Sequence, residues 1–172
     1  MKNYDYILAF DPSGNFNEGK GTTGYCIFDT NNMVIVEVGF LSASQYDSME
    51  SYWKAHINLL LDTVERFPST LIVIEDYLLY ANKKDNQINS RFETSKLIGT
   101  LQYTCFINNI DYIMQTAAEV KNRWTDDILV HKGYVTKSGN GLKLLSGLHI
   151  NRHIKDAIRH AVHSATFKIK EK

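Results

Sequence analysis

The sequence has few cysteines, no surplus of charge of either sign and no long apolar run, and each absence narrows what the protein can be. The two cysteines, Cys26 and Cys105, lie far apart, and no apolar signal segment is present. This argues against an oxidised secreted scaffold and favours two buried free thiols in a reducing compartment. No apolar stretch approaches the roughly 20 residues needed to cross a bilayer, so we expect a soluble protein.

The overall charge is balanced, with 19 basic and 19 acidic residues, which argues against a protein that simply coats nucleic acid. The distribution is uneven. From Leu129 to the end there are nine Lys or Arg against Asp156 and Glu171, a surplus of seven. Such a basic segment beside an acidic remainder fits an enzyme in which carboxylates bind metal and a basic surface holds phosphates; a solvated basic tail is the alternative.

Apolar runs and turn residues predict three strands in the first quarter of the chain. Tyr6–Phe10 is a short apolar run that ends at Asp11, before Pro12 and Gly14. Segments 23–28 and 34–41 are the next two strands, and the Asp and Asn residues between them favour a tight turn. We therefore expect an antiparallel meander.

After the meander, helices and strands alternate. Apolar residues at steps of three and four predict a helix from about Ser48 to Pro68, and Thr70–Asp76 is continuously apolar like a strand buried on both faces. Further predictions are a loop at 82–89, a helix over 90–106, a strand at 111–116, an irregular segment at 125–140 and a last helix from about 151 to 167. The 172 residues suit one domain, an α/β fold with a mixed five-stranded sheet flanked by helices.

Asp11 and Glu75 each end an otherwise apolar strand, where an unpaired buried charge would cost several kcal/mol. If the two strands are neighbours, both carboxylates emerge at one edge of the sheet, and a divalent cation between them removes their repulsion. Each residue taken alone has a simpler explanation, because acidic residues also suit the turn that follows a strand.

The last helix adds a polar stripe. His153, Asp156, His160 and His163 follow at steps of three, four and three, on one helical face, while the apolar stripe contains Ile154 and Ile158. A solvated face is the alternative, and we expect His160 and His163 to be bystanders on it. Hard oxygen ligands suit Mg²⁺ or Mn²⁺ better than Zn²⁺, and two such ions about 4 Å apart are a known arrangement for phosphodiester hydrolysis.

Several short motifs together resemble the RuvC-type Holliday junction resolvases of the ribonuclease-H-like superfamily, particularly the short versions carried by bacteriophages. In chain order they are Asp11-Pro-Ser, Thr23-Gly-Tyr, Ile74-Glu75, Ala118-Glu-Val-Lys121 and His153-x-x-Asp156-Ala157. Each motif is weak, but their order and spacing cover nearly the whole chain.

The resemblance implies a homodimer that nicks four-way DNA junctions symmetrically with Mg²⁺ or Mn²⁺, with two ions per site, in the cytoplasm of a bacterium or a phage-infected host cell. It implies that Asp11, Glu75, Asp156 and His153 are metal ligands, with His160 as an alternative fourth ligand. Lys121 matches a basic residue of the family and is expected to contact the scissile phosphate. The residues that we expect to bind DNA are Lys20, Tyr77, Leu78, Lys83, Lys84, Lys121, Arg123, Lys132 and Lys137.

The sequence departs from the family in two places. Leu78 stands where the family has an aromatic wedge, which puts the junction-opening device in doubt. The loop from Gly14 to Gly21 is longer than expected and imitates a phosphate-binding P-loop, but Gly21 replaces the required Ser or Thr, and a strand follows instead of a helix. We interpret it as a flexible basic loop near the metal site.

Other functions fit the same features. A ribonuclease H acting on RNA–DNA hybrids, or a less selective flap or branch nuclease, would share the metal chemistry. A sugar-kinase-like or actin-like ATPase would need a second, similar half. A non-catalytic junction-binding protein would use neither Asp11 nor Glu75, and its binding would not depend on Mg²⁺.

Overall fold

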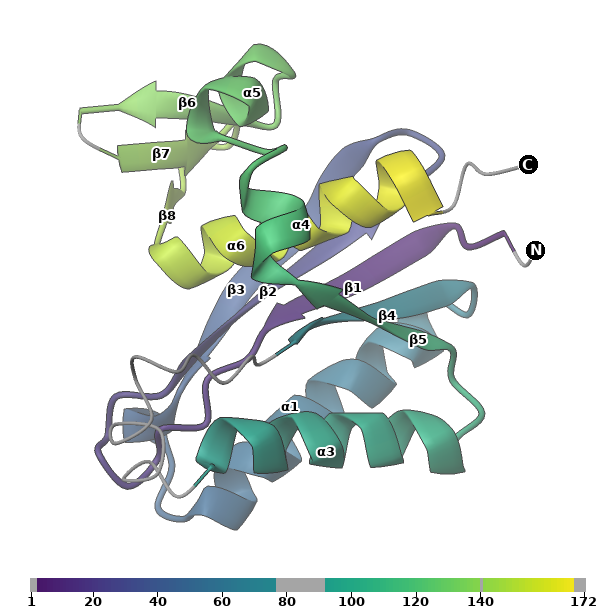
Figure 1. The fold of residues 1–172 in the computed structure, drawn as a ribbon, viewed down its shortest axis with the longest axis vertical. Coiled ribbons are helices and arrows are strands. Elements are labelled where there is room, and N and C mark those ends of the chain that lie inside the picture. The colour runs from purple at the N-terminus through teal and green to yellow at the C-terminus, as the bar shows by residue number, and fades with distance from the viewer. Residues whose placement is uncertain (1–2, 77–91, 140, 169–172) are drawn as a thin grey trace.

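The computed structural model describes residues 3–76, 92–139 and 141–168. A five-stranded sheet runs through its centre in the order β3-β2-β1-β4-β5 (Figure 1). The strands are β1 (Tyr6–Asp11), β2 (Thr22–Asp29), β3 (Val34–Ser42), β4 (Thr70–Asp76) and β5 (Tyr112–Thr116). The first three pair antiparallel, while β1–β4 and β4–β5 are parallel. This confirms the predicted meander and the mixed five-stranded α/β sheet.

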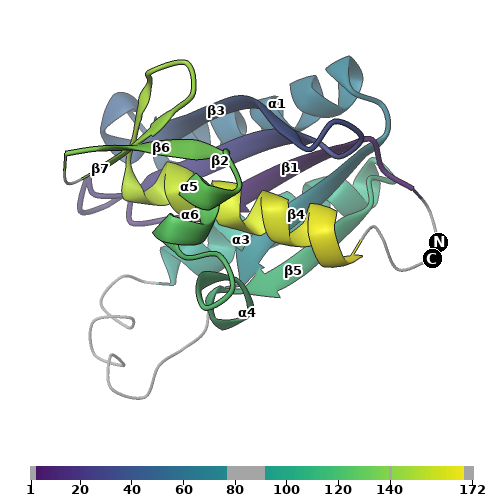
Figure 2. The same ribbon diagram turned by 90° about the horizontal axis from the view of Figure 1, so that it is seen from above.

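Helices cover both faces of this sheet. The long helices α1 (Met49–Arg66) and α3 (Glu93–Ile107) lie on one face, and α6 (Arg152–His163) crosses the other face over β2 and β1 (Figures 1 and 2). Alternate residues of β1 serve the two layers: Ile7 and Ala9 pack toward α6, and Leu8 and Phe10 pack toward α1 and α3. Burial on both faces explains why β1 and β4 are continuously apolar in sequence.

The prediction of an irregular segment over 125–140 was wrong. The chain there forms α5 (Asp126–His131) and β6 (Val135–Ser138), and β6 pairs with β7 (Gly141–Leu144) and β8 (His149–Ile150) in a second, three-stranded sheet. α5, β6 and β7 each have one fully or nearly fully buried apolar residue, which is Leu129, Val135 and Leu142 respectively. One buried residue per element leaves too little periodicity for a prediction from sequence.

Smaller features agree with the expectations or add to them. α6 continues into a π-helical turn at Ser164–Lys168, so the last helix covers the predicted range. The short helix α4 (Ala117–Lys121) and the 3₁₀ turn Ala43–Gln45 were not foreseen. Cys26 and Cys105 are buried and unpaired, as predicted. The predicted loop at 82–89 lies outside the described residues. None of the described helices is long and apolar enough to span a membrane.

Candidate active site

The strand order brings the two strand-terminal carboxylates together. β1 and β4 are parallel neighbours, with Phe10 opposite Ile74. Asp11 comes directly after Phe10 and Glu75 directly after Ile74, so the two carboxylates lie at the same edge of the sheet. Asp156 reaches this edge from α6, which lies across β1 and β2. Three carboxylates from three separate elements therefore converge, and their charges act on one another.

Asp11 is largely buried beside the first turn of α6. His153 Nδ1 lies 2.7 Å from Asp11 Oδ2. Burial raises the pKa of Asp11, and the negative charges of Glu75 and Asp156 raise it further, although the hydrogen bond with His153 acts in the opposite direction. The ionised form of Asp11 is therefore held at a free-energy cost in the folded protein.

Glu75 has the opposite balance. Burial alone would raise its pKa, but the hydrogen bond from His160 and the positive charges of His160 and Lys121 outweigh burial, so that the pKa lies below its usual value. His160 Nε2 lies 2.8 Å from Oε2, and Lys121 Nζ lies 3.5 Å from Oε1. Both carboxylate oxygens thus face basic side chains.

Asp156 is almost completely buried among basic groups. Its Oδ1 accepts a hydrogen bond of 2.8 Å from Arg159, and its Oδ2 lies 3.1 Å from Lys121 Nζ and 3.9 Å from Arg152 Nε. Arg159 also donates to Asp126 Oδ1 at 2.6 Å, which fastens α5 to α6. The buried charge of Asp156 is compensated as a buried carboxylate must be.

Lys121 occupies the centre of this cluster. It is the last residue of α4, a helix that follows directly on β5 and is started by a capping box between Thr116 and Glu119. Burial would lower the pKa of Lys121, but the carboxylates of Glu75 and Asp156 raise it above its usual value. The ammonium group therefore stays charged and bridges two carboxylates.

Asp11, Glu75 and Asp156 provide carboxylate oxygens, which are the ligands that a hard divalent cation prefers, and the imidazoles of His153 and His160 lie beside them. As the side chains stand, however, no three His, Cys, Asp or Glu residues in the described part of the chain are arranged to hold one ion. The Lys121 ammonium lies between Glu75 and Asp156 and neutralises their charge. The position between these two carboxylates is therefore one that attracts a cation. An ion that used both carboxylates would have to displace Lys121.

The polar face of α6 is not the solvated face considered as an alternative. His160 is completely buried against Glu75, and His163 is nearly buried, so the expectation of two solvated bystanders was wrong. The apolar stripe is buried as predicted. The spacing alone could not reveal this, because the side of α6 that faces β4 depends on how the helix crosses the sheet.

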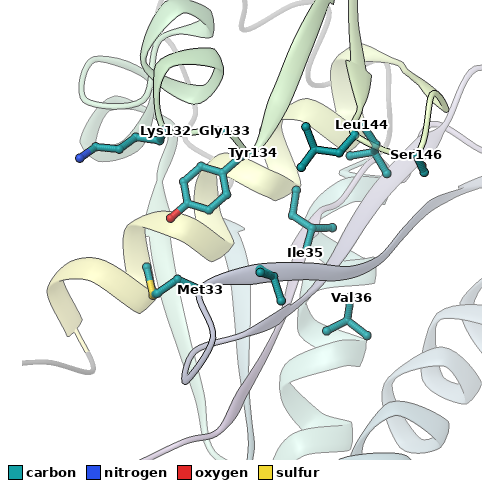
Figure 3. A pocket seen from close by; sticks show the side chains of 10 residues that line it. Met33, Ile35, Val36, Lys132, Gly133, Tyr134, Leu144 and Ser146 are labelled. Carbon is teal, nitrogen blue, oxygen red and sulfur yellow. The ribbon is translucent and has the colours of Figure 1, made fainter.

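The predicted DNA-binding residues are distributed over several surfaces, and of those described only Lys121 contacts the carboxylates. Lys20 pairs with Glu18, Lys137 pairs with Asp127, and Arg123 stacks over the Phe167 ring. Lys132 borders an apolar pocket between β3 and the small sheet (Figure 3). Tyr77, Leu78, Lys83 and Lys84 lie outside the described residues.

The loop from Gly14 to Gly21 is fastened to the start of α3. Gly14 donates its N–H to Thr94 Oγ1 at 3.0 Å, and the backbone and side chain of Asn17 donate to the buried Glu93. Strand β2 follows this loop, so the P-loop is excluded as predicted. A loop held in this way differs from the flexible loop that we expected.

A hydrogen-bonded network beside the Asp11 loop was missed by the sequence analysis. His56 Nδ1 donates to the Tyr52 carbonyl at 2.7 Å, so its Nε2 accepts from the Thr23 hydroxyl at 2.8 Å. Tyr52 donates to the Ser13 carbonyl, and the Ser13 N–H donates to Thr23. This buried network fixes the chain two residues after Asp11. Thr23 was singled out only as part of a motif, and the sequence gives no signal for His56.

Together, the mixed sheet, the helices on both faces and the carboxylates at the ends of β1 and β4 define a ribonuclease-H-like fold. Among solved structures, the chain is similar to RuvC of Thermus thermophilus in complex with a Holliday junction substrate, with a TM-score of 0.67, 12% identity and coverage of 96% of each chain. A second Thermus thermophilus RuvC structure matches with a TM-score of 0.66, 11% identity and 95% coverage of each chain. At this level of identity the likeness establishes the fold. No protein-family model and no curated protein sequence matches the chain.

Proposed function

We propose that this protein is a metal-dependent endonuclease that resolves Holliday junctions and related branched DNA. The observation that carries the proposal is the convergence of Asp11, Glu75 and Asp156 from β1, β4 and α6 around Lys121, at the edge where the parallel strands end. Bringing like charges together in a buried place destabilises the folded state. Such clusters are typical of active sites, where the same charges serve in catalysis or metal binding.

Asp11, Glu75 and Asp156 would hold Mg²⁺ or Mn²⁺, with His153 as a further ligand. Two ions held there would supply the chemistry of phosphodiester hydrolysis, by lowering the pKa of a water nucleophile and stabilising the leaving oxygen. His153 hydrogen-bonds Asp11 and so orients its carboxylate. Lys121, charged and already beside the carboxylates, is suited to contact the phosphate that is cut.

The proposed substrate class rests on two observations. The fold is similar to a RuvC that was solved with a Holliday junction substrate. From Leu129 onward the chain also carries a surplus of seven basic residues over acidic ones, and this segment includes the small sheet and α6. We assign the DNA contacts to Lys20, Arg123, Lys132 and Lys137, together with Tyr77, Leu78, Lys83 and Lys84. The short bacteriophage type and a place in the cytoplasm of a bacterium or infected host complete the proposal.

A homodimer is part of this proposal, because a symmetric junction needs two cuts. One face of α3 offers a surface for it. Gly99, Tyr103 and Phe106 follow at steps of four and three, and all are exposed, with Tyr103 at 64% and Phe106 at 74%. Phe92, directly before the helix, is exposed as well. A stripe of exposed aromatic residues that starts at a glycine permits close approach of a second helix. Replacing Tyr103 and Phe106 by Glu should give a monomer in sedimentation experiments, while Leu145→Glu in the turn between β7 and β8 should not.

Cleavage of labelled four-way junction, linear duplex and RNA–DNA hybrid tests the function, with Mg²⁺, with Mn²⁺ and with EDTA. Paired symmetric nicks in the junction alone, lost with EDTA, are expected. Cutting of the hybrid would indicate a ribonuclease H, and cutting of flaps or forks at equal rates would indicate a less selective branch nuclease. Metal-independent binding without cutting would leave a junction-binding protein.

The matched pair of variants for this assay is Asp11→Asn and Asp62→Asn. Asp11→Asn should abolish cutting while junction binding survives, because only a transition-state interaction is lost. Asp62 is exposed on α1, away from the carboxylates, and its replacement should leave the rate unchanged. Near-normal cutting by Asp11→Asn would show that the assignment of the site is wrong.

A further inference from the structure

A buried chain of hydrogen bonds ends on Glu75. Gln115 on β5 lies directly beside Glu75 in the register of the parallel strands, and His160 of α6 packs over both. Gln115 Nε2 donates to Ser164 Oγ at 2.6 Å, and Gln115 Oε1 lies 2.8 Å from His160 Nδ1. Gln115, His160 and Ser164 are all almost inaccessible to solvent.

The direction of these hydrogen bonds is determined by the groups themselves. An amide oxygen only accepts, so His160 Nδ1 must donate to Gln115 Oε1. The ring is then held at both nitrogens, with Nε2 turned toward Glu75 Oε2 at 2.8 Å. A ring held at both nitrogens cannot turn without breaking a buried hydrogen bond, which leaves a buried polar group unpaired.

The contact orients the two oxygens of Glu75 differently. Oε2 is engaged by His160, and Oε1 is the oxygen that faces Lys121, which in turn reaches Asp156. The other two carboxylates share this pattern, since His153 engages one oxygen of Asp11 and Arg159 engages one oxygen of Asp156. A side chain of α6 therefore forms a hydrogen bond with one oxygen of each carboxylate.

Packing alone does not account for His160 and Gln115. Both side chains lie on the α6 face of the sheet, in a layer that is largely built from buried apolar residues such as Val73, Ala157 and Ala161. Burying an imidazole and an amide destabilises the folded state unless hydrogen bonds within the protein replace those to water. The hydrogen bonds of Gln115 and His160 connect both side chains to Glu75.

We propose that His160 is a positioning residue of the active site, which, supported by Gln115 and Ser164, fixes the Glu75 carboxylate so that Oε1 faces the metal position. This inference rests on the proposed nuclease function. Partners behind metal ligands typically change metal affinity or activity by about 10- to 100-fold when removed. His160 lies one helical turn beyond Asp156, so α6 would supply both a ligand and the support of another ligand.

Three variants of His160 separate its two hydrogen bonds. His160→Gln places a donor near the former Nε2 and keeps the bond to Glu75, whereas His160→Asn keeps a polar group near Nδ1 only, and His160→Leu removes both. The measurement is Mn²⁺ binding to the DNA-free protein by calorimetry, together with junction cleavage and the melting temperature. His131→Gln, on the exposed end of α5, is the control.

His160→Asn and His160→Leu are expected to weaken Mn²⁺ binding about 10- to 100-fold, and His160→Gln to stay within a few-fold of the wild type. A folded His160→Leu protein that binds Mn²⁺ like the wild type would overturn the inference. A purely structural role would lower the melting temperature of all three variants without this order in metal affinity.

Two further variants keep the test decisive if His160→Leu does not fold. Gln115→Met leaves His160 in place but removes its support, and a smaller loss of Mn²⁺ affinity is expected. In a Glu75→Gln background, His160→Asn should have no additional effect on Mn²⁺ binding, because the interaction that it removes is already gone. If the wild type neither binds Mn²⁺ nor cuts junctions, the proposed function itself is wrong, which is distinguishable from failure of this inference alone.

Discussion

Gly24 lies directly against the main chain of His153. A Cβ atom at position 24 would come within 2.2 Å of the carbonyl carbon of His153, closer than atoms can approach. Gly24 is also the partner of Asp11 across the β1–β2 ladder. The first turn of α6 can therefore rest on β2 beside Asp11, and this contact places His153 within hydrogen-bonding distance of Asp11.

Gly24→Ala is expected to shift α6 and to disturb the His153–Asp11 contact. The overpacking should lower the free energy of unfolding by about 1–3 kcal/mol and reduce junction cleavage more strongly than junction binding. Gly141→Ala is the control, because a Cβ there meets only ordinary contacts. Chemical denaturation and cleavage assays measure both effects; a Gly24→Ala protein with normal stability would contradict the close approach.

The two strand-terminal carboxylates should have opposite effects on stability in metal-free buffer at pH 7. The raised pKa of Asp11 means that its ionised form costs the folded state free energy, so Asp11→Asn should raise the melting temperature. The lowered pKa of Glu75 means that its ionised form contributes stability, which is lost as the pH falls through that pKa. Glu75→Gln should therefore lower the melting temperature. Each kcal/mol corresponds to roughly 2–4 °C in a chain of this size, within reach of calorimetry.

Lys121→Ala should separate metal binding from catalysis. The ammonium bridges Glu75 and Asp156, so its removal leaves more negative charge for a divalent ion, and Mg²⁺ should bind more tightly. Cleavage should fall roughly 100-fold, because a positive charge near the phosphate is lost. Lys54→Ala, on the exposed side of α1, serves as the control. Weaker Mg²⁺ binding by Lys121→Ala would show that Lys121 does not compete with the ion.

His56 should make the fold sensitive to mild acid. Burial lowers the pKa of His56 from 6.5 to about 4, so the unfolded chain takes up this proton first. The stability contributed by neutral His56 is complete above pH 6.5 and is lost as the pH falls from 6.5 toward 4, by roughly 3 kcal/mol in total.

His56→Asn keeps a donor toward the Tyr52 carbonyl but does not titrate. Urea unfolding of the two proteins between pH 4 and pH 7 isolates the histidine, since acid effects on other groups are common to both. The difference between the two free energies of unfolding should shrink as the pH falls; a difference that is constant with pH would exclude His56 as the cause.

The central part of the fold could be predicted because its signals are local. Strands buried on both faces are continuously apolar, as at Thr70–Asp76, and α1 shows helical periodicity from Met49 onward. Asp11 and Glu75 stood out for the same reason, as charges ending apolar strands. Short elements with single buried residues, such as α5 and β6, carry no such signal and were missed.

The sequence by itself determined the mixed sheet, the long helices and the carboxylates that end β1 and β4. Only the tertiary structure decided that His160 lies on Glu75 and not in solvent, that Gln115 supports it, and that Lys121 bridges two carboxylates. These contacts join β4, β5, α4 and α6. The physical reason is that the partner of a polar residue depends on how α6 crosses the sheet, and that crossing depends on close packing such as Gly24 against His153, which no local pattern encodes.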